Sequence, residues 1–501
     1  MMESRKGPVL LATLPWVLAC AFALVLPFLP FFHPILSPDS LHYADIAGTF
    51  SRGEGLAMGH LNLASRAVPD PFLYWPPLYP VLLAGGLKLG LGMEGSFRLV
   101  LALSLLFSCL GVSWTAGLLG GRRFGLLCGA AWLALFPFQK FWFHAWSEVP
   151  FAALAALAVA FLARGSHRPA SPWWFLPAGI TAGLAALCRY PGVAALPLAG
   201  LAILAVSRRE RSSLLSRKNL LRAALFLAPF LLLFLPWILR NLPLGGPFGP
   251  PRKPAPGGAL LFQAGALFAA SLRLLYLPAG LAGVLFILGR WGEKVEKGGW
   301  NSSVLLILWG FLLFYGALLV LLGGMILFDR IGRRLAGPML VSLLPLALAG
   351  GYALSERAWK KRPALSALPP VSLLLAILWA GALFARGFPR RDDKRMLPPR
   401  VAQWIRTHTP PGSLVVGPRS WWVPYQADRP VLESGYPEQE PLTPEGVKAF
   451  LGRFPGRFPT VYLLVQKDLP EAVSLERAFK NEGLLEKAGI QEGRWSVYAF
   501  K

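Results

Sequence analysis

The chain has 501 residues, of which 55% are hydrophobic and 15% charged, and its formal net charge is +25. A soluble globular protein does not accommodate so much apolar sequence in long recurring segments, so the composition excludes a soluble enzyme and indicates a polytopic membrane protein. Much of the positive charge lies in loops between apolar segments, where it orients helices and attracts anionic lipid, so a nucleic-acid partner is not needed to explain it.

The apolar segments predict an α-helical bundle of about eleven transmembrane helices. They lie near residues 9–32, 96–120, 124–138, 147–164, 173–188, 191–206, 220–239, 272–289, 300–324, 335–353 and 364–385. Residues 259–270 are compatible with a further span or with a helix in the membrane interface. No clear small-residue cleavage site follows the first segment, which we interpret as a retained anchor.

The charged loops predict the orientation. With a cytoplasmic N-terminus, alternate crossing places the basic loops inside, as expected of a multi-pass plasma (inner) membrane protein. These loops contain Arg122 and Arg123, Arg164 and Arg168, the cluster from Arg208 to Lys218, Arg290 and Lys294, and the cluster from Arg357 to Arg362. The transmembrane domain then covers residues 1–386, and its long first loop, residues 33–95, faces outward with loop helices.

A change of composition marks a separate C-terminal part. Residues 387–397 form the predicted linker, and residues 398–501 a small, outward-facing soluble α/β domain. The pattern predicts a helix around Val401, Trp404 and Ile405, a second helix at 471–487, and strands at 413–417, 460–465 and 495–500. The four cysteines all fall in predicted spans without metal-ligand spacing, which favours packing roles.

The first loop begins with a candidate reactive acid. Asp39 follows the first span and sits in the first turn of a helix predicted over residues 38–52, which Pro38 opens. A carboxylate near the headgroups can act on lipid-linked substrates, whose reacting ends lie at that depth. An acid in this position can also simply cap the helix and complement its dipole.

Several motifs occur in an order that resembles a known superfamily. They are Pro38-Asp39-Ser40 with Tyr43-Ala44-Asp45, Tyr74-Trp75-Pro76-Pro77-Leu78-Tyr79-Pro80, Ser147-Glu148, Cys188-Arg189-Tyr190-Pro191-Gly192, Pro236-Trp237 with Arg240-Asn241, and Arg334 four residues before Pro338. The order resembles the C-type, polyprenyl-phosphate-sugar-dependent glycosyltransferases of family 39, which include protein O-mannosyltransferases and aminoarabinose transferases. Ser40 stands where many relatives carry a second acid, and Trp75 where the aminoarabinose transferases carry a lysine, which argues against that narrower assignment.

The resemblance implies an integral-membrane glycosyltransferase that moves a sugar from a polyprenyl-phosphate donor to an envelope lipid, glycan or protein. Such a reaction needs an acceptor hydroxyl to lose its proton while phosphate leaves, so one carboxylate and some positive charge suffice. Asp39 is the expected general base. The arginines expected at the donor phosphate are Arg334 first and Arg240 second, followed by Arg189 and Arg333. Each arginine can equally mark a helix end or meet a lipid headgroup.

The other candidates have two interpretations each. Glu148 begins a span, where an acid is favourable in itself, but it also matches the family's second acidic position. Tyr43, His42 and Tyr79 are candidates for lining a sugar pocket or anchoring at the interface. No cofactor is firmly implied, although a divalent metal that joins His33, His60 or His144 to Asp39 or Glu148 is chemically conceivable.

Two other functional classes stay open at this point. A transporter or lipid flippase would favour paired halves with broken helices and polar groups at the bilayer midplane, whereas the ionisable residues here gather at the outward ends of the spans. A noncatalytic membrane scaffold that presents the C-terminal domain would have no need of Asp39.

Overall fold

The structure is a computed structural model, and it describes residues 24–28, 34–61, 65, 70–73, 75–135, 144–246, 248, 254–272, 274, 300–326, 331–359, 397–418, 420, 422–433, 442–486 and 489–501. Almost all of the predicted spans at 9–32, 272–289 and 364–385, and of the linker at 387–397, lies outside the described residues. The chain divides into two compact units. The first comprises Met1–Pro34, Tyr74–Tyr79 and Phe97–Arg390, and the second Ile35–Leu73, Pro80–Ser96 and Arg391–Lys501.

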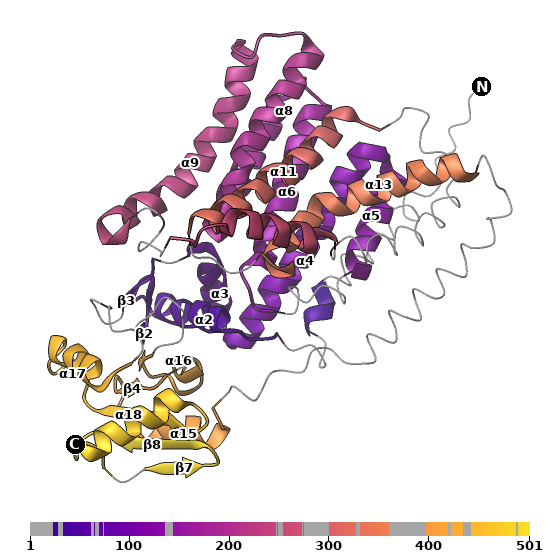
Figure 1. The fold of residues 1–501 in the computed structure, drawn as a ribbon. Coiled ribbons are helices and arrows are strands. Elements are labelled where there is room, and N and C mark those ends of the chain that lie inside the picture. The colour runs from indigo at the N-terminus through magenta and orange to yellow at the C-terminus, as the bar shows by residue number, and fades with distance from the viewer. Residues whose placement is uncertain are drawn as a thin grey trace, which may run out of the picture. The chain divides into compact units, whose positions relative to one another are not determined.

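The first unit is helical (Figure 1). Its elements are η1 (Leu26–Phe28), α4 (Gly92–Gly120, which begins in the second unit), α5 (Arg122–Leu135), α6 (Glu148–His167), η4 (Pro172–Trp174), α7 (Phe175–Cys188), η5 (Tyr190–Ala194), α8 (Ala195–Glu210), α9 (Arg217–Gly245), α11 (Ser302–Met325), α12 (Arg333–Ala336), η7 (Gly337–Met339) and α13 (Leu340–Trp359). Residues 259–272 are also helical.

Among the described residues, 5 helical segments are long and apolar enough to cross a membrane: Gly92–Gly120, Glu148–His167, Tyr190–Glu210, Arg217–Gly245 and Ser302–Met325. Each coincides with a segment that the sequence predicts to be a span. The described part of the chain therefore has the multi-pass character expected from its hydropathy.

Close helix packing depends on glycine at particular points. A Cβ on Gly179 of α7 would lie 2.2 Å from the backbone oxygen of Phe226 in α9, and one on Gly111 of α4 would lie 2.7 Å from the backbone carbon of Ala156 in α6. Because small residues let helix backbones approach, these positions hold the bundle together. α9 also tolerates three internal prolines, at 229, 236 and 243, as membrane helices often do.

The second unit is built on a mixed sheet. Its elements are α2 (Pro38–Ser51), β1 (Ala57–Met58), β2 (His60–Leu61), β3 (Asp70–Pro71), most of α3 (Leu78–Lys88), α15 (Pro399–His408), β4 (Leu414–Val416), α16 (Trp422–Ala427), β5 (Val431–Leu432), α17 (Pro444–Arg453), β6 (Val461–Gln466), α18 (Pro470–Asn481), β7 (Ile490–Glu492) and β8 (Trp495–Ala499). The strand order is β2-β5-β4-β6-β8-β7. β2, β5, β4 and β6 run parallel to one another, and β8 is antiparallel to both β6 and β7.

Two apolar clusters cover the opposite faces of this sheet. Val415 of β4 packs with Leu41 of α2 and Ile405 of α15, whereas its neighbour Val416 packs with Phe450 of α17 and Phe479 of α18. Successive strand residues point to opposite faces, which explains the division. The first loop thus supplies the edge strand β2 to a sheet whose other strands lie near the C-terminus, and it supplies the helix α2 that packs on that sheet. No local pattern in the sequence predicts this pairing.

Candidate functional site

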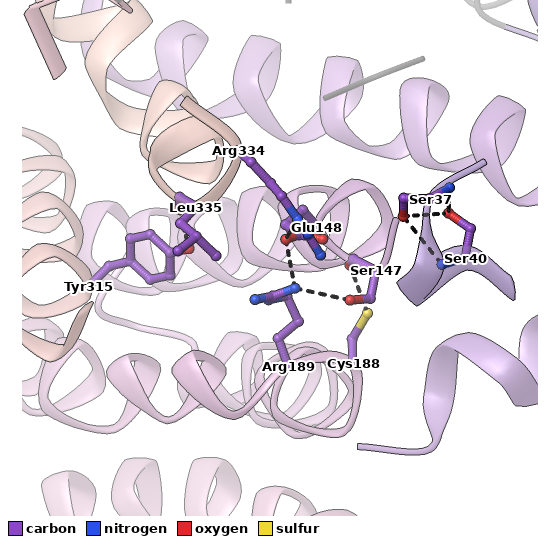
Figure 2. Close-up of polar contacts among 9 residues, drawn as sticks. All are labelled: Ser37, Ser40, Ser147, Glu148, Cys188, Arg189, Tyr315, Arg334 and Leu335. Atoms are coloured by element: carbon purple, nitrogen blue, oxygen red, sulfur yellow. Dashed lines mark hydrogen bonds and ion pairs between the residues drawn. The ribbon is translucent and has the colours of Figure 1, made fainter. Parts of the chain in front are cut away.

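Glu148 is the centre of a buried cluster in the first unit. It is the first residue of α6, follows Ser147, and has no solvent exposure. Its Oε1 atom lies 2.8 Å from an Arg189 guanidinium nitrogen and 2.5 Å from Nε of Arg334. Figure 2 shows the carboxylate of Glu148 between these two arginines, which come from separate elements.

Arg189 is positioned by the turn between α7 and η5. It has extended backbone geometry and also donates to the Ser147 hydroxyl at 3.1 Å. Cys188, just before it, donates its thiol to the Ser147 carbonyl at 3.2 Å. A Cβ on Gly192 would lie 2.4 Å from the backbone nitrogen of Ala186, so only glycine fits this turn without a backbone shift. The Cys-Arg-Tyr-Pro-Gly motif therefore presents Arg189 to the start of α6.

Arg334 is positioned from the other side by α12. Its guanidinium carbon lies 4.2 Å from the centre of the Trp146 ring, a cation–π distance. Tyr315 of α11 donates its hydroxyl to the backbone carbonyl of Leu335 at 2.8 Å, which fixes the short helix (Figure 2). Arg333 is exposed, so the structure separates the two adjacent arginines that the sequence offered as alternatives.

The cluster carries a net charge of one positive unit, because two guanidinium groups surround one carboxylate. The side chains of Arg189 and Arg334 are 13% and 25% exposed, whereas that of Glu148 is 0% exposed. A buried ion pair is costly to remove on one side only, since it leaves an uncompensated charge. Glu148 thus aligns two partly exposed arginines, and paired arginines are well suited to a phosphate.

Arg240 belongs to a neighbouring aromatic group on α9. Its guanidinium carbon lies 4.8 Å from the Trp237 ring centre, and it donates to Asn241 at 2.9 Å. The Trp237 indole donates to the hydroxyl of Tyr190 at 3.1 Å. Because Tyr190 directly follows Arg189, the contacts of Tyr190 with Trp237 and of Trp237 with Arg240 connect the positions of Arg189 and Arg240. The sequence did not predict these contacts.

Asp39 belongs to the second unit and lies in the first turn of α2, as predicted. The residue that caps this helix is Ser37, whose hydroxyl accepts from the backbone nitrogen of Ser40 at 3.4 Å while the Ser40 hydroxyl accepts from that of Ser37 at 3.1 Å. This reciprocal capping box satisfies the helix end. Ser37, and not Asp39, therefore caps this helix. Ser40, which stands where many relatives carry a second acid, completes the capping box.

The aromatic candidates are interior residues. Tyr43 is 1% exposed and Tyr79 is 2% exposed. Tyr79 packs against Phe97 with 6.5 Å between ring centres. Burial of this degree is typical of packing, so neither a sugar pocket nor an interface anchor follows from the structure for these two tyrosines.

His42 lies in a buried group within the second unit. Its ring is 4.1 Å from that of His60, and its Nε2 atom is 3.8 Å from the Glu433 carboxylate. Burial lowers the pKa of His42, and the neighbouring His60 lowers it further. Burial raises the pKa of Glu433 to about 8, with a further rise from Asp45 against a lowering by His60. Glu433 has no motif around it that would predict a role, and the pairing of β5 with β2 brings it to the histidines.

Comparison with known proteins supports the motif order described above. Residues 75–239, which contain Glu148 and Arg189, match the family described as dolichyl-phosphate-mannose-protein mannosyltransferase. No curated protein sequence matches the chain.

Similar folds occur among solved structures. ArnT from Cupriavidus metallidurans bound to undecaprenyl phosphate has a TM-score of 0.62 at 17% identity, over 97% of this chain and 98% of that one. The Archaeoglobus fulgidus oligosaccharyltransferase, solved with Zn and sulfate, has a TM-score of 0.58 at 14% identity, over 95% and 71% of the two chains. The chain therefore shares its fold with these two proteins.

A third similar structure is the mycobacterial arabinofuranosyltransferase AftD, with a TM-score of 0.55 at 18% identity, over 97% of this chain and 41% of that one. The resemblance read from the motif order agrees with the family match over residues 75–239 and with the fold shared with these structures. The membrane glycosyltransferase fold places Glu148, Arg189 and Arg334 together, although they come from three separate motifs.

Proposed function

We propose that this protein is a glycosyltransferase that moves a sugar from a polyprenyl-phosphate donor to an envelope lipid, glycan or protein on the outer side of the membrane. The observation that carries the proposal is the alignment of Arg189 and Arg334 by the buried Glu148. A site with one net positive charge at the ends of apolar helices suits a lipid-linked phosphate, which combines an anionic head with an apolar tail. The undecaprenyl phosphate bound in the ArnT structure supports the same donor class.

Asp39 is the proposed general base. In a single inverting displacement, the acceptor oxygen attacks the anomeric carbon, the bond from that carbon to the phosphate oxygen breaks, and the acceptor proton passes to the carboxylate of Asp39. General-base assistance of this kind contributes a factor of roughly 10² to 10⁴. Since Ser37 and Ser40 already cap α2, the helix end does not depend on Asp39 for its cap.

The negative charge that develops on the leaving phosphate would be stabilised by arginine. Arg334 and Arg189 are the proposed contacts because Glu148 holds both, and Arg240 is the third, oriented by its stacking on Trp237. Guanidinium groups bind phosphate oxygens in pairs of parallel hydrogen bonds, which adds direction to the attraction.

The topology proposed with this function has about eleven transmembrane helices, a cytoplasmic N-terminus, and an outward C-terminal α/β domain covering residues 398–501. The basic loops support the orientation. The mixed sheet of the second unit supports a soluble C-terminal domain, and β2 and α2 add the first loop to it. Accessibility of single cysteines introduced at Arg211 and Arg457 to an impermeant thiol reagent would test it: labelling in intact cells at 457 alone is expected.

The deciding experiment measures transfer of labelled sugar from polyprenyl-phosphate donors to envelope acceptors in membranes. Asp39→Asn is expected to abolish transfer while donor binding persists. The surface variant Asp468→Asn serves as the matched control, because Asp468 is exposed and pairs with Arg494. Equal transfer by Asp39→Asn and wild type would remove Asp39 from the chemistry. Movement of the lipid across the bilayer without sugar transfer would instead indicate a transporter or flippase.

A further inference from the structure

Three potential metal ligands from separate elements meet inside the second unit. His42 comes from the first half of α2, His60 from strand β2, and Glu433 directly follows strand β5. Their ligand atoms all lie within 4.8 Å of one another. The parallel pairing of β2 with β5 brings the last two together, since the Glu433 backbone nitrogen donates to the Leu61 carbonyl at 3.0 Å.

The buried carboxylate of Glu433 is the feature that indicates a ligand. The residue is 1% exposed, and among the described residues neither of its carboxylate oxygens has a hydrogen-bond partner. The Nε2 atom of His42 lies 3.8 Å from the Oε1 atom of Glu433. A carboxylate buried without hydrogen bonds is expensive, and native proteins retain such groups where an ion, a proton or a ligand compensates them.

Asp45 holds the His60 ring on the side of its Nδ1 atom. Its Oδ2 atom lies 2.8 Å from Nδ1 of His60 and also accepts from the backbone nitrogen of Gly59 at 2.6 Å. An imidazole whose Nδ1–H is held by a carboxylate presents the other ring nitrogen as a ligand in a fixed orientation. A carboxylate–histidine pair of this kind is the usual outer shell of a zinc-bound histidine.

We propose that His42, His60 and Glu433 bind a transition-metal dication of the Zn²⁺ class. Two imidazoles and one carboxylate are a common zinc ligand set. Ligand atoms of a tetrahedral zinc lie about 3.3 Å apart, given metal–ligand distances of about 2.0–2.1 Å. Because the ligand atoms here lie within 4.8 Å of one another, the side chains need to close by about 1.5 Å at most.

The metal would tie α2 to the edge of the sheet. His42 lies three residues after Asp39 on this helix, so the two share one face. The metal would fix the orientation of the segment that carries Asp39 through bonds that apolar packing around Leu41 alone does not supply. The proposed metal positions the segment that carries Asp39, and its binding can be tested independently of the transfer reaction.

The test uses the full chain, purified in detergent with an affinity tag that contains no histidine, because a polyhistidine tag would bind metal itself. After equilibration with micromolar Zn²⁺ and removal of excess, elemental analysis should give about one zinc per chain. X-ray absorption at the zinc edge should show nitrogen and oxygen ligands at about 2.0–2.2 Å and no sulfur. Zinc should also raise the melting temperature of the chelator-treated protein.

Variants assign the ligands. His42→Gln, His60→Gln and Glu433→Gln should each abolish the stoichiometric zinc, and Asp45→Asn should weaken zinc affinity by about 10–100-fold. His408→Gln and Glu445→Gln, at exposed positions of the same unit, are the matched controls and should keep it. A wild-type chain that binds no zinc, or zinc retained equally in all three ligand variants, would overturn the proposal. Zinc lost from the ligand variants with transfer intact would support the site and disprove a positioning effect on Asp39.

Discussion

Replacing Glu148 with glutamine is the sharpest test of the arginine cluster. The change keeps the size of the side chain and one carbonyl oxygen, but it removes the negative charge that both arginines share. A hydrogen bond to a charged group contributes about 1.5–3 kcal/mol and a neutral one about 0.5–1.5 kcal/mol, so each of the two contacts weakens by about 1 kcal/mol. The total loss is about 2 kcal/mol.

The solvent exposure of the two arginines limits the energy lost in Glu148→Gln. Glu148 is fully buried, whereas Arg189 and Arg334 are 13% and 25% exposed and are partly screened by solvent. If the arginines stabilise the leaving phosphate, a loss of about 2 kcal/mol lowers kcat/KM about 30-fold. Glu148→Ala, which leaves both guanidinium groups without a buried acceptor, should cost more, about 3–5 kcal/mol, and destabilise the fold.

The assay is the initial rate of sugar transfer over a range of donor concentrations, with folded protein matched by size-exclusion chromatography. Glu94→Gln is the control, because Glu94 is also an acid in the first turn of a long apolar helix but lies outside the cluster. Wild-type kcat/KM in Glu148→Gln would refute the idea that Glu148 aligns the phosphate-binding arginines. A loss confined to melting temperature would reduce the cluster to a structural role.

Three further predictions concern packing and protonation. Gly192→Ala should disturb the turn that presents the first arginine and lower transfer at least tenfold, because its Cβ would lie 2.4 Å from a backbone nitrogen, whereas Gly200→Ala, with nothing within 4 Å, should be neutral or slightly stabilising. Leu41→Ala should destabilise the second unit by about 2–5 kcal/mol and increase proteolysis of the C-terminal residues, since Leu41 is fully buried in the core of that unit. In the metal-free protein, stability should fall as the pH rises from 6.5 to 8, because burial raises the pKa of Glu433 to about 8 and the folded state keeps a proton that the unfolded chain has lost.

Each of these predictions has its own contradictory result. Equal transfer by the two glycine variants would mean that the turn adapts without moving the arginine. If Leu41→Ala is cleaved no faster than Leu89→Ala, whose position is 73% exposed, α2 does not stabilise the core of the second unit. The pH slope should vanish in Glu433→Gln. Below pH 6.5 the lowered pKa of His42 acts in the opposite direction, so a slope confined to that range would implicate the histidine instead.

The sequence by itself determined the membrane character and most of the described spans. Hydropathy is a local property that adds along a segment, so a run such as Ser302–Met325 is recognisable without its neighbours. The start of α2 at Pro38 and the strand Val461–Gln466 were predictable for the same reason, since helix-opening residues and buried strands leave signals within a few residues. The order of the motifs indicated the resemblance to the C-type glycosyltransferases.

The tertiary structure decided which side chains meet. The motif ranked Arg334 ahead of Arg333, but its partner could not be read from the sequence: Arg334 contacts Glu148, whereas Arg333 is exposed. Likewise, β2 joins β5 and carries His60 to Glu433 across most of the length of the chain. Contacts between distant residues depend on register and packing, and these leave no periodic trace in the sequence.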